Sequence, residues 1–106
     1  MAWTIILYEA AAKELVIQPP DIRAKLDHVV ELIANFGLER IPAKYARHLQ
    51  GPLWEFRLKG KDGIARVLYV TAHGQRIVIV RVFAKKTQKT PRKEIQLALK
   101  RAKEVT

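Results

Sequence analysis

Residues 53–84, LWEFRLKGKDGIARVLYVTAHGQRIVIVRVFA, decide the fold because three strand patterns follow one another there with only tight turns between them. Successive side chains of a strand point to opposite faces. The first pattern shows this alternation, with Trp54, Phe56 and Leu58 against Glu55, Arg57 and Lys59. Asp62-Gly63 and His73-Gly74 lie in the two turns, and Asp-Gly is a strong hairpin signal. We therefore expect an antiparallel meander of strands 53–58, 64–71 and 76–84.

The segments on either side of the meander predict one further strand and three helices. Residues 3–8 are β-branched and aromatic, which is typical of a strand, and residues 9–17 have the composition of a short helix. Apolar residues at helical spacing predict a second helix from Pro20 or Asp21 to Phe36. Residues 38–52 read as irregular, and Thr90-Pro91 is a helix start that precedes a narrow apolar stripe.

These elements predict a single α+β domain spanning residues 1–106, in the order β-α-α-β-β-β-α. We expect a mostly antiparallel four-stranded sheet, with an N-terminal helical hairpin on one face and a C-terminal helix. In the last strand, strict alternation predicts Val78, Val80 and Val82 on one face and Ile77, Ile79, Arg81 and Phe83 on the other.

The net positive charge of the chain lies entirely in its second half. Residues 1–50 carry six Lys/Arg and six Asp/Glu, whereas residues 51–106 carry fourteen Lys/Arg and four Asp/Glu, which gives the net charge of +10. A sheet with many cations on its faces attracts polyanions, and RNA or DNA is the default partner. The absence of cysteine excludes disulfides and thiolate chemistry, and no His/Asp/Glu spacing suggests a metal or cofactor. No apolar run has the length of a membrane span and no secretion signal is present, so we expect a cytoplasmic protein without membrane contacts.

Three motifs resemble a known superfamily. They are Leu53-Trp54-Glu55-Phe56-Arg57, Ala65-Arg66-Val67-Leu68-Tyr69, and the run from Phe83 to Pro91, FAKKTQKTP. With the order of elements, they resemble the HigB-like, phage-derived branch of the RelE/ParE toxin superfamily over about residues 3–104. The resemblance implies a single RelE-like toxin domain that cleaves mRNA on the ribosome, with a helix-turn-helix antitoxin as its cognate partner. The ParE branch of the superfamily acts on gyrase instead, so the fold alone does not define the chemistry.

The catalytic candidates are Arg57, Arg66, Arg81 and His48. Cleavage by the ribose 2′-oxygen requires loss of its proton, stabilisation of the pentavalent phosphate and protonation of the leaving oxygen. Toxins of this superfamily often use arginine and lysine for these tasks, and Arg57 and Arg66 match the motif positions. Each could instead be a solvated strand charge. Arg81 could stabilise transition-state charge or pack its stem on Phe83. His48 precedes the Trp54 strand and is the candidate general base, since some relatives have a functional histidine in a similar loop.

Four lysines are candidate RNA-binding residues: Lys59, Lys85, Lys86 and Lys89. They stand at strand ends or in the motif before the last helix, and the alternative is a solubilising rim. Their partner could be RNA, the ribosome or an acidic antitoxin segment. Glu55 is more typical of a structural ion pair with a neighbouring cation than of acid–base work, and His28 and His73 read as exposed or structural.

The leading hypothesis is therefore an endoribonuclease that blocks translation, and two alternatives stay open. One is inhibition of gyrase by binding, and the other is a non-catalytic RNA-binding module. The nuclease hypothesis requires the guanidinium groups of Arg57 and Arg66 to converge in one open hollow. Burial of either group beneath the packed layer, or projection of the two to opposite sides, would undo the proposal in this form.

Overall fold

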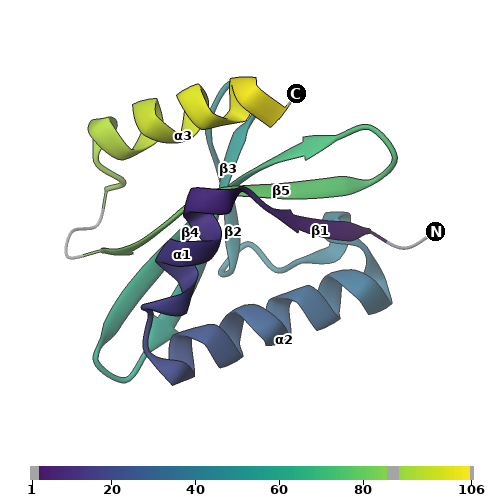
Figure 1. Cartoon of the computed structure of the whole chain (residues 1–106). Coiled ribbons are helices and arrows are strands. Elements are labelled where there is room, and N and C mark those ends of the chain that lie inside the picture. The colour runs from purple at the N-terminus through teal and green to yellow at the C-terminus, as the bar shows by residue number, and fades with distance from the viewer. Residues whose placement is uncertain (1–2, 86–88, 106) are drawn as a thin grey trace.

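The computed structural model describes residues 3–85 and 89–105, which form a five-stranded sheet with helices on both faces (Figure 1). Its elements are, in chain order, β1 (Thr4–Leu7), α1 (Glu9–Val16), α2 (Pro20–Phe36), the 3₁₀ helix η1 (Leu38–Arg40), β2 (Ala46–Gln50), β3 (Leu53–Gly60), β4 (Gly63–Ala72), β5 (Arg76–Lys85) and α3 (Arg92–Val105). The α+β class and the predicted helices are confirmed.

The sheet has the strand order β1-β5-β4-β3-β2, so the predicted four-stranded sheet is wrong in one respect. The meander β3-β4-β5 is antiparallel as expected, and β1 pairs with β5 in parallel. The additional strand is β2, which pairs with β3 inside the segment expected to be irregular. Arg47, His48 and Gln50 of β2 are exposed. An edge strand with so few buried side chains carries no apolar alternation in its sequence.

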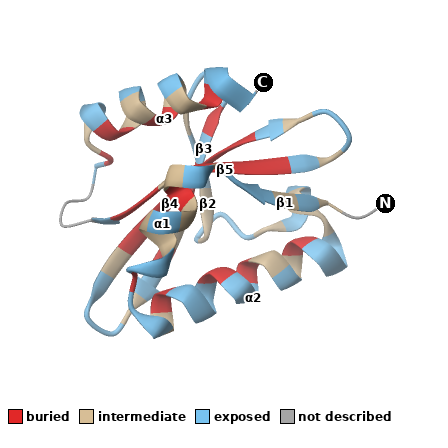
Figure 2. Cartoon of the chain, viewed as in Figure 1, coloured by how far each residue is buried: buried red, intermediate tan, exposed pale blue. Residues whose placement is uncertain are grey.

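Two apolar clusters lie on opposite faces of the sheet. On one face, the buried stripe of α2 packs against Phe56, Val67 and Tyr69. On the other face, Ala98 and Ala102 of α3 pack against the side chains of β4 and β5. The buried sides of α2 and α3 are those turned toward the sheet (Figure 2). Because both faces are covered, a charged side chain on a strand interior faces protein on either side.

The helical hairpin differs from its expected arrangement. Residues 17–19 join α1 to α2, and Gly37 ends α2 with a positive φ of 87°. However, α1 contacts β5 whereas α2 contacts β3, and the two helices extend in different directions (Figure 1). The helices therefore cover different parts of the sheet. This arrangement leaves α1 beside the stretch of β5 that continues past the end of β1.

A β-bulge changes the faces of β5. Tyr69 pairs with Ile79 but Leu68 pairs with Arg81, so Val80 is the extra residue. Both residues at a bulge oppose one partner residue, and alternation shifts beyond it. Val80 and Phe83 consequently belong to the α3-side cluster, while Val82 belongs to the α2-side cluster. The strict alternation predicted for this strand holds through Val80 and is wrong from Arg81 onward, and Arg81 faces α3 instead of the apolar layer under α2.

Candidate nucleic-acid interface

Arg57 and Arg66 lie directly opposite each other on β3 and β4, and both project from the α3 side of the sheet. Their environments differ. Arg57 is half-buried, whereas only 1% of Arg66 is exposed to solvent. The two arginines share a face as expected, but the expectation of one open hollow is wrong for Arg66. The physical reason is that α3 packs on this face and that Arg66 pairs with Glu55, which Thr90 just before α3 also contacts.

Arg66 belongs to a buried cluster centred on Glu55, which is fully buried. The Glu55 carboxylate lies 3.4 Å from Arg66 Nη1 and 3.2 Å from Arg47 Nε. It also accepts a 2.8 Å hydrogen bond from the hydroxyl of Thr90. Burial lowers the pKa of Arg66, and the attraction of Glu55 opposes this shift. The predicted structural ion pair of Glu55 is confirmed, and it joins β2, β3, β4 and the start of the α3 segment.

Arg81 is likewise held by carboxylates. Its Nη1 lies 2.6 Å from Glu14 of α1, and its Nε lies 2.7 Å from Glu94 of α3. Its guanidinium is also 5.5 Å from the ring of Phe83, in agreement with the packing considered from the sequence. Hydrogen bonding to Glu94 raises the pKa of Arg81. Two carboxylates thus neutralise this cation and fix α1 and α3 to β5.

Glu14 satisfies the free edge of β5. Beyond the end of β1, the N–H of Val82 donates to Glu14 at 3.1 Å, and Arg101 donates to Glu14 at 3.0 Å and to the Val80 carbonyl at 2.9 Å. Desolvation raises the pKa of Glu14, but its hydrogen bonds with Arg101, Val82 and Arg81 outweigh it, and the net shift is downward. This network is structural, because it closes an edge that would otherwise be unpaired.

Arg57 and Lys59 differ from these two arginines because the described residues provide no carboxylate partner for either. Both lie on the same face of β3, at the point where β2 no longer pairs with it. The backbone N–H of Arg57 donates to the Tyr45 carbonyl at 2.7 Å, which fixes the preceding loop to this edge. Arg57 and Lys59 are therefore neighbouring strand cations that are available to an external anion.

The edge of β3 also borders a basic cavity of about 260 Å³ that sequence reasoning missed. Arg57 and Lys59 line it with Lys25 and His28 of α2 and with Lys44 from the loop before β2. Lys25 and Lys44 belong to the half of the chain without net charge, so the charge distribution did not reveal them. The only sequence signal was the i, i+3 spacing of Lys25 and His28 on one side of a helix.

The structure does not bring His48 to Arg57. His48 pairs with Trp54, so it faces the side of the sheet opposite to Arg57. Its ring lies 5.2 Å from the Trp54 ring, and its Nε2 is 2.8 Å from the Gly51 carbonyl oxygen. A general base must be within hydrogen-bond reach of the proton that it removes. This arrangement therefore gives the sequence-based assignment of His48 no support.

The remaining candidate lysines follow β5. Lys85 ends β5 opposite Ile64, and its side chain is outside the described part of the chain. Lys86 lies outside the described residues altogether. Lys89 is exposed immediately before Thr90. The described ends of the FAKKTQKTP motif therefore lie in β5 and beside Glu55.

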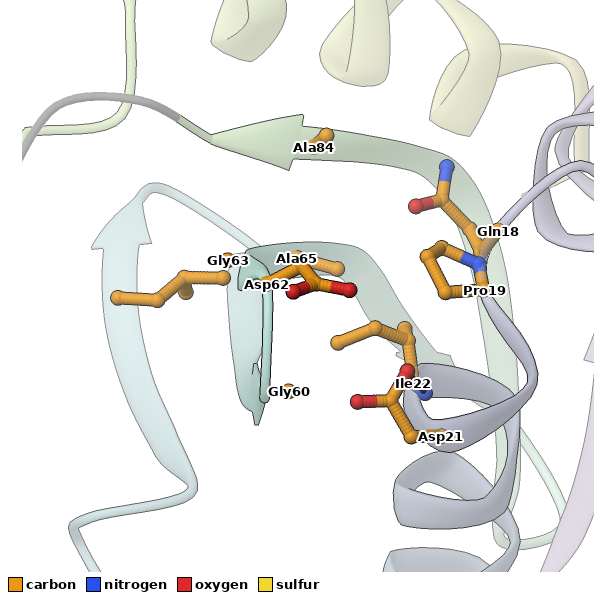
Figure 3. A pocket seen from close by; sticks show the side chains of 10 residues that line it. Gln18, Pro19, Asp21, Ile22, Gly60, Asp62, Gly63, Ala65 and Ala84 are labelled. Atoms are coloured by element: carbon orange, nitrogen blue, oxygen red, sulfur yellow. Dashed lines mark hydrogen bonds between the residues drawn. The ribbon is translucent and has the colours of Figure 1, made fainter.

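A smaller cavity of about 90 Å³ lies where the β3–β4 hairpin meets the start of α2 (Figure 3). Asp21 Oδ2 accepts the backbone N–H of Lys61 at 2.8 Å, and Asp21 Oδ1 accepts that of Ile22 at 3.0 Å. An added Cβ on Gly60 would lie 2.6 Å from Asp21 Oδ2, so glycine is needed for this approach. With Asp21 and Asp62 in its lining, this cavity is unsuited to phosphate and serves the packing of the hairpin.

The described residues include neither a cluster of metal-binding side chains nor a membrane-spanning helix. No group of three or more His, Cys, Asp or Glu side chains there has a geometry that could hold a metal ion. Nor is any helix among them both long enough and apolar enough to cross a membrane.

The strand order, the bulged meander and the helices on both faces define an α+β protein of RelE-like fold. A double arginine-to-alanine variant of E. coli toxin RelE, solved in the free state, matches 95% of this chain and 98% of its own with a TM-score of 0.69. The sequence identity is 20%, so this likeness concerns the fold. None of the curated proteins matches the chain. The family model described as Phage derived protein Gp49-like (DUF891) matches residues 13–103, and the chain belongs to that family. The RelE-like fold and the phage-derived family that the resemblance implied are thus confirmed.

Proposed function

We propose that this protein is the toxin of a type II toxin–antitoxin pair and acts as a ribosome-dependent mRNA endonuclease. The RelE-like fold and membership of the Gp49-like family support the toxin assignment. The observation that carries the nuclease proposal is Arg57, a half-buried cation with no carboxylate partner among the described residues, beside the exposed Lys59.

Arg57 is the proposed catalytic residue. A guanidinium can hold two oxygens of one phosphate, and its charge stabilises the pentavalent phosphate as the 2′-oxygen attacks. Removal of water by the bound message strengthens this interaction, because a charge acts more strongly at lower dielectric. Lys59 and Lys89 are proposed to contact flanking phosphates, and Lys85 and Lys86 stay candidates for the same role.

Arg66 and Arg81 are proposed as positioning residues. Glu55 holds Arg66 beside Arg57 on the neighbouring strand, and we propose that the like charge of Arg66 directs the Arg57 guanidinium toward solvent. Arg81 fixes the position of α3 on the sheet through its ion pair with Glu94. We assign no proton transfer to His48.

The proposed partner is a cognate helix-turn-helix antitoxin. A protein with a net charge of +10 is inhibited effectively by an acidic or amphipathic segment laid over its cationic surface. Such a segment would compete with message for Arg57 and Lys59. The proposal therefore predicts that bound antitoxin and bound RNA exclude each other.

The test is cleavage of a defined message in a reconstituted translation system, with and without ribosomes. Wild-type protein should cut the message only with ribosomes, and Arg57→Ala should reduce the rate by about 10²-fold because a preorganised charge at the transition state is lost. Arg23→Ala removes an exposed arginine of α2 and is the matched control, with no expected change.

Two outcomes would reject the nuclease proposal. Growth arrest with intact message and stabilised gyrase cleavage complexes would indicate a gyrase inhibitor. Harmless expression without any partner, together with salt-sensitive RNA binding, would indicate a non-catalytic module.

A further inference from the structure

The basic cavity between α2 and the edge of β3 gathers cations from three separate segments. Lys25 and His28 lie one turn apart on α2, Lys44 precedes β2, and Arg57 and Lys59 come from β3. Residues at i and i+3 share one side of a helix, so both α2 side chains face the strand edge. The cavity of about 260 Å³ thus lies among four permanent cations and one imidazole.

None of the described residues that line this cavity carries a carboxylate. The described residues also include no ion-pair partner for Lys25, Lys44, Arg57 or Lys59. The neighbouring cavity at the β3–β4 hairpin is different, since Asp21 and Asp62 line it (Figure 3). Cations that converge on a concave surface without counter-charges create a strong positive potential there. Such a potential selects an anion.

The frame of the cavity is formed in advance. Its apolar floor includes Val29 and Leu58, each 1% exposed. The Arg57 N–H bonds the Tyr45 carbonyl, and the rings of Tyr45 and His28 meet edge to face with centroids 6.4 Å apart. Lys44 Nζ lies 5.0 Å from the centroid of the Tyr45 ring. The backbone and the aromatic rings around the cavity are therefore ordered before an anion enters, which limits the ordering needed on binding to the exposed lysine side chains.

We propose that this cavity is a subsite for a backbone phosphate of single-stranded RNA. The inference rests on the proposed function, because Arg57 borders both the cavity and the α3-side face of β3. Pairing between β2 and β3 ends at Ala46 and Phe56, and the Tyr45 carbonyl bonds the Arg57 N–H just beyond it, so Arg57 lies at the end of this ladder, between the two surfaces. An RNA chain with one phosphate at Arg57 on the α3-side face would place a following phosphate in the cavity. The repeated charge of RNA satisfies both surfaces, whereas a single small anion would engage only one.

The test compares two doubly substituted proteins that lose the same charge. Lys25→Ala/Lys44→Ala removes two cavity cations, and Lys100→Ala/Lys103→Ala removes two exposed lysines of α3. Binding of a short fluorescein-labelled oligouridine is measured by anisotropy over a range of salt concentrations. The cavity variant should bind about tenfold more weakly, and its salt slope should fall by about 0.7, the contribution of one single-strand phosphate contact. The control should bind within about twofold of wild type.

The imidazole of His28 provides a local readout that general electrostatics does not move. In NMR titrations with the oligouridine, the ring signals of His28 should shift, and those of His73 in the β4–β5 turn should not. Equal binding by the cavity variant and wild type, or an unmoved His28 signal, would overturn the subsite. A loss of affinity for an oligoglutamate peptide, with RNA binding unchanged, would also overturn it and indicate a protein-binding surface.

The outcomes separate this inference from the proposed function. Normal message cleavage with normal RNA affinity in Lys25→Ala/Lys44→Ala would retain the nuclease and reject the subsite. RNA binding that depends on the cavity, in a wild-type protein that leaves message intact on ribosomes, would retain the subsite and reject the nuclease.

Discussion

Replacing Glu55 with glutamine should destabilise the protein more than replacing Arg66 with methionine, although the two residues form one buried ion pair. Loss of one partner of a buried pair costs about 3–5 kcal/mol when the other charge is left uncompensated. Glu55→Gln would leave the Arg66 guanidinium, 1% exposed, without its counter-charge, so we expect a loss of about 3–5 kcal/mol.

Substitution of the other partner, Arg66, leaves Glu55 with two of its contacts. In Arg66→Met, Glu55 would still be 3.2 Å from Arg47 and would still accept the 2.8 Å hydrogen bond from Thr90. Methionine also fills much of the arginine volume with apolar groups. We expect a loss of about 1–2 kcal/mol, which is within the ordinary range for one substitution. The double variant should lose less than the sum of the single losses, by about 1–3 kcal/mol, because the two residues are in direct contact.

Urea-induced unfolding followed by tryptophan fluorescence measures these differences, with Trp54 on β3 as a reporter close to the cluster. Total stability is expected at about 5–15 kcal/mol, so Glu55→Gln should leave a weakened but measurable transition. Equal losses for the two single variants, or strict additivity in the double variant, would refute the reasoning. The same variants show whether Arg66 is a positioning or a catalytic residue. If it is a positioning residue, the cleavage rate of folded Arg66→Met should fall less than that of Arg57→Ala.

Two further predictions concern stability. Glu14→Gln should lower stability by about 1–2 kcal/mol at neutral pH. The pKa of Glu14 is lowered in the folded protein, so its contribution to stability is complete above the ordinary carboxyl pKa of 4.5 and is lost as pH falls through the lower folded value. The stabilities of wild type and variant should therefore converge in acid. Parallel pH profiles of unfolding would contradict this. Gly60→Ala should cost about 1–3 kcal/mol in thermal unfolding because the new Cβ would meet Asp21 Oδ2 at 2.6 Å and Ile22 Cδ1 at 2.8 Å; an unchanged midpoint would show that the hairpin moves away freely.

Most of the fold could be predicted because local patterns define its elements. The turn at Asp62-Gly63 and the alternation of β3 predict the first hairpin, and the stripe of Ile22, Leu26 and Ile33 predicts α2. The strand β2 could not be predicted in this way. Its exposed side chains have no periodic pattern, and it is a strand only because its backbone pairs with β3. Non-local pairing of this kind has no local sequence signal.

The candidate site was predictable only in part, because the position of a cation on a strand does not tell whether it is available. Arg57 and Arg66 each lie in a strand motif and share one face, yet of these two arginines only Arg66 pairs with Glu55. The carboxylate and the covering segment near Thr90 reach Arg66 through tertiary packing. The cations of the basic cavity were missed for a related reason: Lys25 and Lys44 are far apart in sequence and meet only because α2 lies against the edge of β3.

Arg81 shows the same principle through backbone geometry. Without the bulge at Val80, strict alternation from Ile79 would direct Arg81 toward the apolar cluster beneath α2. The bulge turns Arg81 toward α3, where Glu94 and Glu14 receive it. A one-residue irregularity thus converts a cation that would oppose folding into one that joins three elements. Of the four residues proposed from the sequence as catalytic, this leaves Arg57 as the cation that both faces the α3 side and lacks a carboxylate partner in the described structure, and its substitution is the one that should separate catalysis from stability.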